Sequence, residues 1–574
     1  MQNIKEIIAQ FLTNTYRPKI IDELKSYDRE RFKNDLFAGV IVGIVALPLA
    51  IAFGIASGVS PEQGIITAII GGFIVSAMGG SSVQIGGPTG AFIVVVYGIV
   101  SSFGTEGLII ATLLAGLMLV LMGVFKLGSI IRFIPYPLIV GFTAGIAVII
   151  FTSQIRDLFG LNIVDMPGDF LSDWMAYGMA LSSVNPWSVG VSALSIAIIV
   201  LWPKVTKKVP GSLVAIVGVT LIAFLLQRYA GVQGIVTVGD RFSINAELPK
   251  PELIPISLQT FRLLLAPAFT IAMLGAIESL LSATVADGVT GQKHDANTEL
   301  IAQGAANLVV PLFSGIPVTG AIARTMTNIN NGGRTPVAGI VHAAVLLIIF
   351  LFLGSLTSYI PLATLAAVLV VVAYQMSQWR SIVALLRHPK SDIAVLLTTF
   401  GLTVLFDLTI AIEIGMLMAI LLFIKRIAET TDISMIKSKH VSDPSEVDLQ
   451  KNKFVTPDGV EIYQIEGPFF FGIATRFNEV MTNLGNRPKV RIIRMRYVPF
   501  IDSTGINNLQ SLAELSARQH CTLLLSGVNE TVYETMEQSG FISVIGAEHV
   551  FSKFEDSLNY ATQLVEAKKH EEQH

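Results

Sequence analysis

The chain has 574 residues, too many for one compact domain of the usual 100 to 200 residues. Only 14% of the residues are charged and 52% are hydrophobic, and the mean hydropathy is +0.65. This composition excludes a disordered, collagenous or ordinary cytosolic chain. The net charge is -3, and the absence of a basic stretch argues against nucleic acid as a partner.

Charge is distributed unevenly. Residues 1–35 carry 13 charged side chains, and residues 428–574 carry 34. The 392 residues between them carry no more than 34 charged side chains, so the middle of the chain is much poorer in charge. We therefore expect a cytoplasmic N-terminal segment (1–35), a transmembrane domain (36–427), a linker (428–452), a soluble domain (453–565) and a C-terminal tail (566–574). The single cysteine, Cys521, lies in the soluble part and cannot form an intrachain disulfide, which suits a reducing cytosol.

The apolar runs predict fourteen membrane helices, because a helix needs roughly 20 apolar residues to cross a bilayer. Glycine, proline and charged residues mark the loops between them. The helices are expected near 36–57, 62–79, 89–102, 107–125, 135–155, 187–203 and 211–227, and then near 263–285, 298–313, 320–331, 337–354, 361–376, 392–406 and 408–427.

The Lys and Arg residues in the loops predict the orientation of the helices in the membrane. If the chain starts inside, fifteen Lys and Arg residues near the ends of the helices fall on the inner side and five on the outer side. Cytoplasmic loops collect such residues, so this count favours an inner plasma membrane protein with both termini in the cytoplasm. The expected outer loop at 157–186 contains four Asp and no Lys or Arg.

Two glycine-rich interruptions occur at corresponding places in the two halves. Pro88 is followed by Thr89-Gly90-Ala91, and Pro317 is followed after one residue by Thr319-Gly320-Ala321. The same offset of 230 residues relates Pro48 in the first helix to Glu278 in the eighth. Such interrupted segments point to a substrate site in transporters built from repeats. We therefore predict a seven-plus-seven inverted repeat with two half-length helices.

A helix that begins in mid-membrane leaves backbone N–H groups unpaired at its positive end, and these groups bind anions. Gly90 and Gly320 would allow close approach, and the hydroxyls of Thr89 and Thr319 would add donors. The alternative is that these glycines and prolines only kink packed helices, which membrane proteins tolerate.

Two ionisable residues stand near these interruptions. Glu278 is the only charged residue between Arg262 and Asp287, and with Ser282 it is a candidate for coupling to protons or a cation. The alternative is a structural carboxylate bonded to a neighbouring helix. Arg324 could give an anion site a fixed positive charge, or it could extend its charged head to the cytoplasmic interface.

Residues after 427 alternate between strand and helix patterns. Strands are expected at 460–465, 490–495 and 521–525, and helices at 474–484, at 530–539 and from Asp502-Ser503-Thr504-Gly505 to about Arg518. This part resembles the STAS domain (sulfate transporter and anti-sigma factor antagonist). The resemblance makes Ser503 the position that is phosphorylated in anti-sigma antagonists, although capping of the helix is the simpler role. The domain could also bind a cytosolic protein partner.

The membrane part resembles the sulfate permease (SulP) family, the bacterial relatives of solute carrier family 26. The resemblance rests on Leu47-Pro48-Leu49-Ala50-Ile51-Ala52-Phe53, Gly86-Gly87-Pro88-Thr89-Gly90, Asn297-Thr298-Glu299-Leu300 with Gln303, Gly304 and Asn307, and Gly320-Ala321-Ile322-Ala323-Arg324-Thr325. Leu49 departs from the polar residue that many animal relatives carry at this position.

The resemblance implies a homodimer in which a core of helices 1–4 and 8–11 moves against a gate of helices 5–7 and 12–14 by an elevator-like motion. The anion would bind between helices 1, 3, 8 and 10. This placement implies a site made by Phe53, Thr89, Gly90, Glu278, Ala321, Ala323 and Arg324.

The sequence therefore predicts a secondary active anion transporter, most simply a sulfate importer coupled to H⁺ or Na⁺. Bicarbonate or C4-dicarboxylate symport, uncoupled exchange or a channel, and a membrane-tethered sensor remain as alternatives. An enzyme is not expected, because the sequence contains no Cys/His metal cluster and no phosphate-binding loop. We expect no cofactor and no metal site.

Overall fold

The computed structural model describes residues 16–129, 134–163, 166–167, 169–206, 209–243, 247, 249–251, 257–406, 408–435, 456–482 and 488–571. The chain forms two compact units, residues 1–419 and 420–574. Arg132, Asp165, Lys207 and Lys208, which entered the predictions of orientation and loop charge, and most of the expected linker lie outside the described residues.

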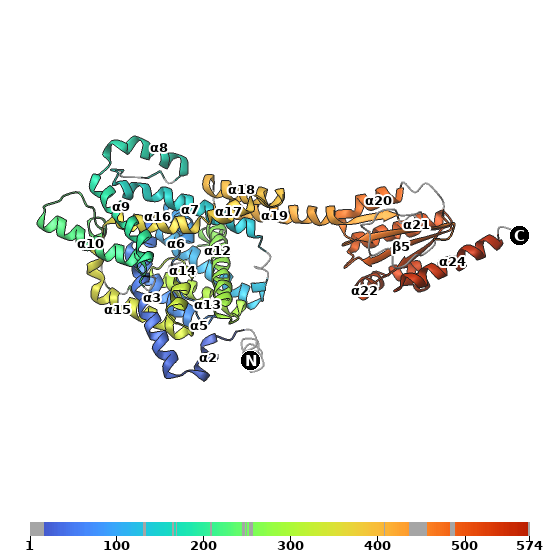
Figure 1. The fold of residues 1–574 in the computed structure, drawn as a ribbon, viewed down its shortest axis with the longest axis horizontal. Coiled ribbons are helices and arrows are strands. Elements are labelled where there is room, and N and C mark those ends of the chain that lie inside the picture. The colour runs from blue at the N-terminus through green and yellow to red at the C-terminus, as the bar shows by residue number, and fades with distance from the viewer. Residues whose placement is uncertain are drawn as a thin grey trace. The chain divides into compact units, whose positions relative to one another are not determined.

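The first unit is helical (Figure 1). Its first half contains α2 (Lys19–Glu23), α3 (Arg29–Ala56), α4 (Pro61–Ile66), a π-helical turn (Thr67–Gly71), α5 (Gly72–Met78), α6 (Ile93–Val124), α7 (Tyr136–Phe159), α8 (Phe170–Ala180), α9 (Pro186–Leu201), α10 (Gly211–Tyr229) and α11 (Val238–Arg241). Its second half contains α12 (Leu258–Thr290), α13 (Ala296–Val309), α14 (Ile322–Asn330), α15 (Pro336–Leu353), α16 (Leu362–Met376), α17 (Trp379–Leu385) and α18 (Lys390–Leu405), and α19 (Leu408–Thr430) crosses the boundary between the units.

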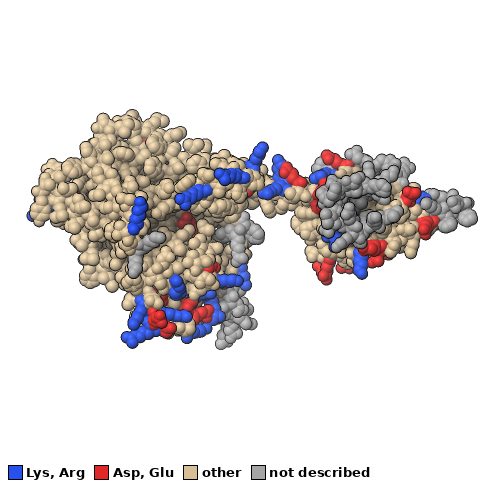
Figure 2. All heavy atoms as spheres, viewed as in Figure 1, with Lys and Arg blue, Asp and Glu red and all other residues tan. Residues whose placement is uncertain are grey.

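Within the described ranges, nine helical stretches are long and apolar enough to cross a membrane. On the face shown in Figure 2, most of the surface of this unit is uncharged, and charged side chains gather at the end where α2 and the start of α3 lie. A bilayer removes water from a helix surface, so only uncharged side chains can face it at low cost. The surface therefore agrees with a multi-pass membrane protein.

The helices pack in two groups. In the first group α6 packs on α12 and α13, and α3 packs on α15; in the second, α7 packs on α16 and α18, and α9 packs on α10. Gly116 of α6 and Gly304 of α13 each face the other helix's backbone so closely that a Cβ would meet it below 3.0 Å. Small residues allow such close approach between membrane helices.

The structure confirms one expected break and contains elements that were not predicted, among them α2, α8, α11 and α17. The break expected between helices 89–102 and 107–125 is confirmed, because α6 (Ile93–Val124) consists of two helices that meet at the non-helical residue Gly104, φ 69°. The acidic loop at 157–186 contains α8, which was not predicted. Asp169 caps its first turn, and Trp174 packs edge-on against Phe170 and Tyr177, so local capping and aromatic packing stabilise this short helix.

The second unit is an α/β domain. Its sheet has the order β3 (Asp432–Met435), β4 (Val460–Glu466), β5 (Val490–Tyr497), β6 (Thr522–Ser526) and β7 (Val550–Phe551). Strand β3 is antiparallel to β4, and the others are parallel. The helices are α20 (Ala474–Thr482), α21 (Ser503–Arg518), α22 (Glu530–Gln538), α23 (Phe541–Ile545) and α24 (Phe554–Glu571).

Candidate functional site

The two glycine-rich interruptions lie side by side in the first unit. Strand β1 (Gly86–Gly87) pairs antiparallel with β2 (Thr319–Gly320), with Gly86 opposite Gly320 and Gly87 opposite Thr319. The N–H of Ala321 also donates to the carbonyl of Ile85 at 2.9 Å. The repeated sequence motif therefore corresponds to two extended segments that cross inside the helical bundle.

Each extended segment leads directly into a helix. A 3₁₀ turn at Gly90–Phe92 continues into α6 after β1, and α14 begins at Ile322 after β2. The nine residues of α14 span only about 14 Å at 1.5 Å per residue, under half of a bilayer core of about 30 Å. The first-turn amides of both helices have no partner within their own helix, so both starts present positive ends.

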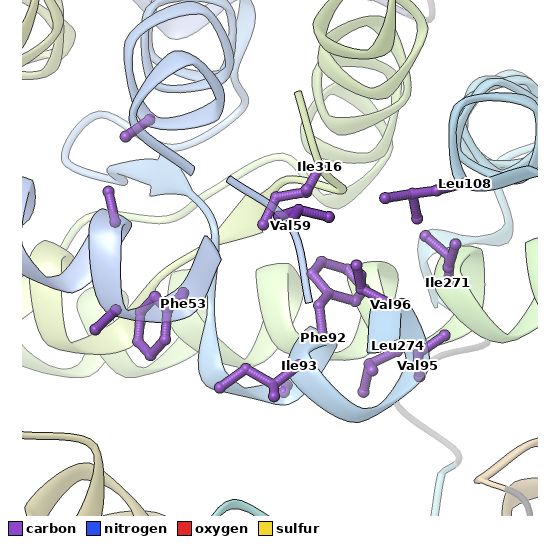
Figure 3. Packing of buried hydrophobic residues seen from close by; sticks show 14 of the residues in the cluster. Phe53, Val59, Phe92, Ile93, Val95, Val96, Leu108, Ile271, Leu274 and Ile316 are labelled. Carbon is purple, nitrogen blue, oxygen red and sulfur yellow. The ribbon is translucent and has the colours of Figure 1, made fainter. Parts of the chain in front are cut away.

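Apolar packing fixes the start of α6. Phe92 is buried between the two halves of the unit and lies near Ile316 and Ile271 in Figure 3. A Cβ on Gly90 would meet Met376 at 2.9 Å, Ile150 at 3.5 Å and Phe53 at 3.6 Å. The structure thus brings Phe53 against Gly90, and it adds Met376 and Ile150 from the second helix group, which sequence reasoning did not select.

Arg324 lies in the first turn of α14 and is buried, with 3% of its surface exposed. Its guanidinium donates to the carbonyls of Gly86 at 3.5 Å and Pro88 at 3.1 Å. The alternative in which Arg324 extends to the membrane surface is therefore wrong, because its charged head is enclosed beside β1.

Glu278 lies on α12 and faces Thr89 on one side and the second helix group on the other. Its carboxyl interacts with the Thr89 hydroxyl, although that hydroxyl has no partner at normal hydrogen-bond geometry among the described residues. A small cavity of about 20 Å³ beside Glu278 is lined by residues of α7 and α19, including Phe142 and Ile412. Glu278 thus stands between the helix groups.

The other predicted site residues differ in their exposure and in whether other residues already bind or pack against them. Ala323 is exposed and Ala321 is buried at the start of α14. Thr319 is fully buried and its hydroxyl already donates to the carbonyl of Gly275 at 2.8 Å. Gly320 packs against the side chain of Gln84, and Ser282 donates to Thr325 at 3.4 Å. Thr319, Gly320 and Ser282 therefore hold the extended segments in place in this structure.

A buried polar network behind β2 was not predicted. The carboxylate of Glu299 on α13 is 0% exposed and accepts five hydrogen bonds. Its donors are the backbone N–H groups of Gly80 and Ser81 and the side chains of Gln84, Ser279 and Gln303, at 2.8–3.2 Å. The signal in the sequence was the polar stripe Glu299, Gln303 and Asn307, spaced four residues apart in an apolar region.

Asn307 extends this network to the second interruption. Its amide accepts from the N–H of Val318 at 2.9 Å and donates to the carbonyl of Val318 at 2.7 Å. This two-point contact fixes the residue just before β2. The polar stripe of α13 therefore positions the segment that leads into α14.

Ser503 belongs to the second unit, separate from the residues above. Asp502 caps α21, as predicted, by accepting from the N–H of Gly505 at 2.8 Å, and it also accepts from the N–H of Phe471 at 3.0 Å. Ser503 is the first residue of α21 and is exposed. Among the described residues there is no cluster of three or more His, Cys, Asp or Glu that could hold a metal ion.

This arrangement of helices and crossed extended segments defines a polytopic helical membrane transporter, and known proteins share it. Murine Solute Carrier 26 family member A9, an anion transporter solved in the inward-facing state, superposes with a TM-score of 0.84 at 20% identity, covering 96% of this chain and 95% of that one. The transmembrane domain of a cyanobacterial bicarbonate transporter, BicA, gives a TM-score of 0.60 at 30% identity over 69% of this chain and 98% of that one.

Sequence comparison gives the family. The Sulfate permease family model matches residues 32–399, and the STAS domain model matches residues 453–557. "Putative sulfate transporter YvdB" of Bacillus subtilis is 40% identical over 93% of this chain and 98% of its own length. The bicarbonate transporter BicA of Picosynechococcus is 33% identical over 77% of this chain and 79% of its own length. The chain belongs to the sulfate permease family and carries a C-terminal STAS domain.

Proposed function

We propose that this anion transporter is a secondary active importer of sulfate. The observation that carries the proposal is the crossing of β1 and β2, which sets the starts of α6 and α14 beside a buried arginine. A doubly charged oxyanion gains more from such a positive site than a singly charged one, since the Coulomb energy scales with the charge. The similarity to YvdB supports sulfate in particular.

The anion binds at the starts of α6 and α14 in this proposal. Gly90 and Ala323 offer backbone approach, and Ala321 lines the site although its N–H already donates to Ile85. Thr89 offers a hydroxyl whose only polar contact among the described residues is the Glu278 carboxyl, and Phe53 closes the apolar side. Arg324 contributes positive charge from behind β1. The proposal assigns Thr319, Gly320 and Ser282 to hold the segments that shape the site.

The proposed architecture is fourteen spans in a seven-plus-seven inverted repeat with two half-length helices. The two helix groups of the first unit correspond to the core and gate of an elevator mechanism, and the pairing of α3 with α15 and of α6 with α13 supports this division. In the proposal the chain acts as a homodimer in the plasma membrane with both termini in the cytoplasm. The STAS domain supports the dimer or binds a cytosolic protein, and Ser503 is its exposed candidate for phosphorylation.

Coupling in this proposal runs through Glu278. A carboxyl group between two moving groups of helices can change its surroundings when one group slides past the other. It can then take up a proton on one side and lose it on the other. A sodium ion is the alternative coupling ion.

One other function has specific support. Bicarbonate transport is favoured by the similarity to BicA, and C4-dicarboxylate transport would use the same positive helix starts. An uncoupled exchanger or channel would need no titration at Glu278, and a pure sensor would bind partners through its STAS domain and move no anion.

Uptake by proteoliposomes tests these alternatives. Labelled sulfate, bicarbonate, fumarate and chloride are offered separately under imposed proton and sodium gradients. The proposal expects the fastest uptake for sulfate, stimulation by an inward gradient of the coupling ion, and loss of that stimulation in Glu278→Gln. Sulfate uptake that ignores both gradients would favour the uncoupled exchanger, and no uptake of any of the four anions would contradict a transporter.

A further inference from the structure

A large cavity in the first unit lies apart from the crossed segments. Its volume is about 860 Å³, and it is lined by the last turn of α3, the first turns of α6, the C-terminal half of α7, and α8 and α11. Ile93 and Val94 line its α6 side, and Gly90, where the proposed anion site begins, precedes Ile93 by one helical turn. The cavity thus extends from α8 and α11 toward that site.

Three polar atoms of residues that line this cavity are buried and have no hydrogen-bond partner among the residues that the structure describes. They are Nε of Arg156, the hydroxyl of Tyr177 and the hydroxyl of Thr152. Tyr177 is 3% exposed and Thr152 is 2% exposed. Leaving a buried polar group unpaired costs free energy, so a cluster of such atoms calls for a bound partner such as water, an ion or a substrate.

These three groups are placed to act together. Thr152 and Arg156 are four residues apart on α7 and therefore lie on the same face of the helix. Arg156 lies within electrostatic range of Tyr177 on α8. All three can donate hydrogen bonds, and burial raises the pKa of Tyr177, which keeps its hydroxyl protonated as a donor. A set of donors with one fixed cation matches an oxyanion.

The other charged side chains of the cavity have partners of their own, although Asp157 also lies within electrostatic range of Arg156 and Tyr177, and Asp173 within range of Tyr177. Asp157 pairs with Arg241 at 3.1 Å, and Asp169 caps α8. Asp173 also has an interaction of its own. The cavity lining as a whole contains two guanidinium groups and three carboxylates, so the carboxylates oppose the local donors and any anion there would be held weakly. This charge balance suits a place where a substrate pauses rather than a tight site.

We propose that Arg156, Tyr177 and Thr152 form an entry subsite where a small oxyanion such as sulfate binds before it reaches the starts of α6 and α14. The proposal of this subsite rests on the proposed transport function. Its three residues are different from those assigned to the anion site at the starts of α6 and α14. Its loss raises the KM for the anion offered from the α8 side, and the maximal rate changes little because the subsite does not take part in the movement of the helices.

The first test is the kinetics of labelled sulfate uptake by proteoliposomes that contain the full chain. Arg156→Gln is expected to raise KM about tenfold, and Tyr177→Phe and Thr152→Val about threefold each, because a charge-assisted hydrogen bond is worth more than a neutral one. Arg156→Lys should give an intermediate KM. Arg228→Gln is the matched control, because it removes one positive charge from an exposed residue outside the cavity.

The second test is direct and needs no transport. In a Cys521→Ala background, Ser153→Cys, at an exposed position next to Thr152 that also lines the cavity, is reacted with a negatively charged thiol reagent in the presence of sulfate or of chloride. Sulfate should slow the reaction at concentrations near KM, and Arg156→Gln should abolish this protection. A cysteine that reacts equally fast with and without sulfate would overturn the entry subsite.

The outcomes separate the two proposals. Wild-type chain that takes up none of the oxyanions contradicts the transport function itself. Wild-type uptake with the same KM in Arg156→Gln as in Arg228→Gln contradicts only the entry subsite. Protection by sulfate together with a raised KM supports both.

Discussion

The guanidinium of Arg324 occupies the space where a side chain on Gly87 would begin. A Cβ on residue 87 would overlap Nη1 of Arg324, and Nη2 donates to the carbonyl of the next residue, Pro88, at 3.1 Å. Gly87 comes from the first half of the first unit and Arg324 from the second, so this contact joins the two crossed segments. The absence of a side chain at residue 87 is therefore a requirement for the position of the arginine.

Gly87→Ala is expected to displace Arg324 and to lower sulfate uptake by about tenfold, since overpacking of this kind costs about 1–3 kcal/mol. The measurement is initial uptake by proteoliposomes with equal amounts of folded protein. Gly218→Ala is the matched control, because a Cβ there would meet nothing within 4 Å. Equal uptake by the two variants would show that Arg324 does not depend on the glycine.

Arg324→Ala tests the charge itself. Removing the cation should weaken the binding of divalent anions more than that of monovalent ones, because the Coulomb energy scales with the charge of the anion. Competition of unlabelled sulfate and chloride against labelled substrate measures both affinities. Arg387→Ala, at an exposed position between α17 and α18, controls for net charge. An equal loss for sulfate and chloride would contradict a guanidinium that acts on the anion.

Glu299→Gln tests the polar network. The amide keeps the shape of the carboxyl but replaces one acceptor oxygen by a donor, so the N–H groups of Gly80 and Ser81, or one of the side-chain donors, lose their acceptor. We expect a free energy of unfolding lower by about 2–4 kcal/mol and a clearly lower thermal midpoint in detergent. Glu413→Gln, on the exposed side of α19, should leave the midpoint unchanged. A midpoint for Glu299→Gln that equals the wild-type value would rule out this role.

The single cysteine reports on the folding of the second unit. Cys521 is 5% exposed, and burial raises the pKa of its thiol, although Arg491 and Lys568 act in the opposite direction. Because the thiolate is the reactive form, alkylation of the folded chain near pH 7.5 should be at least about tenfold slower than alkylation in denaturant. Equal rates in the two conditions would mean that this region is open in solution.

Much of the fold could be predicted from the sequence, because each signal was local. Apolar runs bounded by glycine, proline or charge placed helices such as 135–155 and 211–227 within a few residues of α7 and α10. The repeated Thr-Gly-Ala located both extended segments. The cap at Asp502 was also predicted, since a helix start needs an acceptor nearby in the sequence.

The contacts of the site could not be predicted, because they join residues far apart in the chain. The bond from Thr319 to Gly275, the enclosure of Arg324 by β1, and the five donors to Glu299 depend on how helices of the two halves pack. Helix α8 was missed for a different reason: it is short, and aromatic contacts and one cap stabilise it rather than a long apolar run.

The most direct test of the account is a difference map between cryo-electron microscopy reconstructions of the chain with and without selenate, a close mimic of sulfate. We expect new density at the starts of α6 and α14, within hydrogen-bond distance of the backbone N–H groups near Gly90 and Ala323. If protein that transports sulfate shows no new density at this position in saturating selenate, the result would contradict an anion site at the crossed segments.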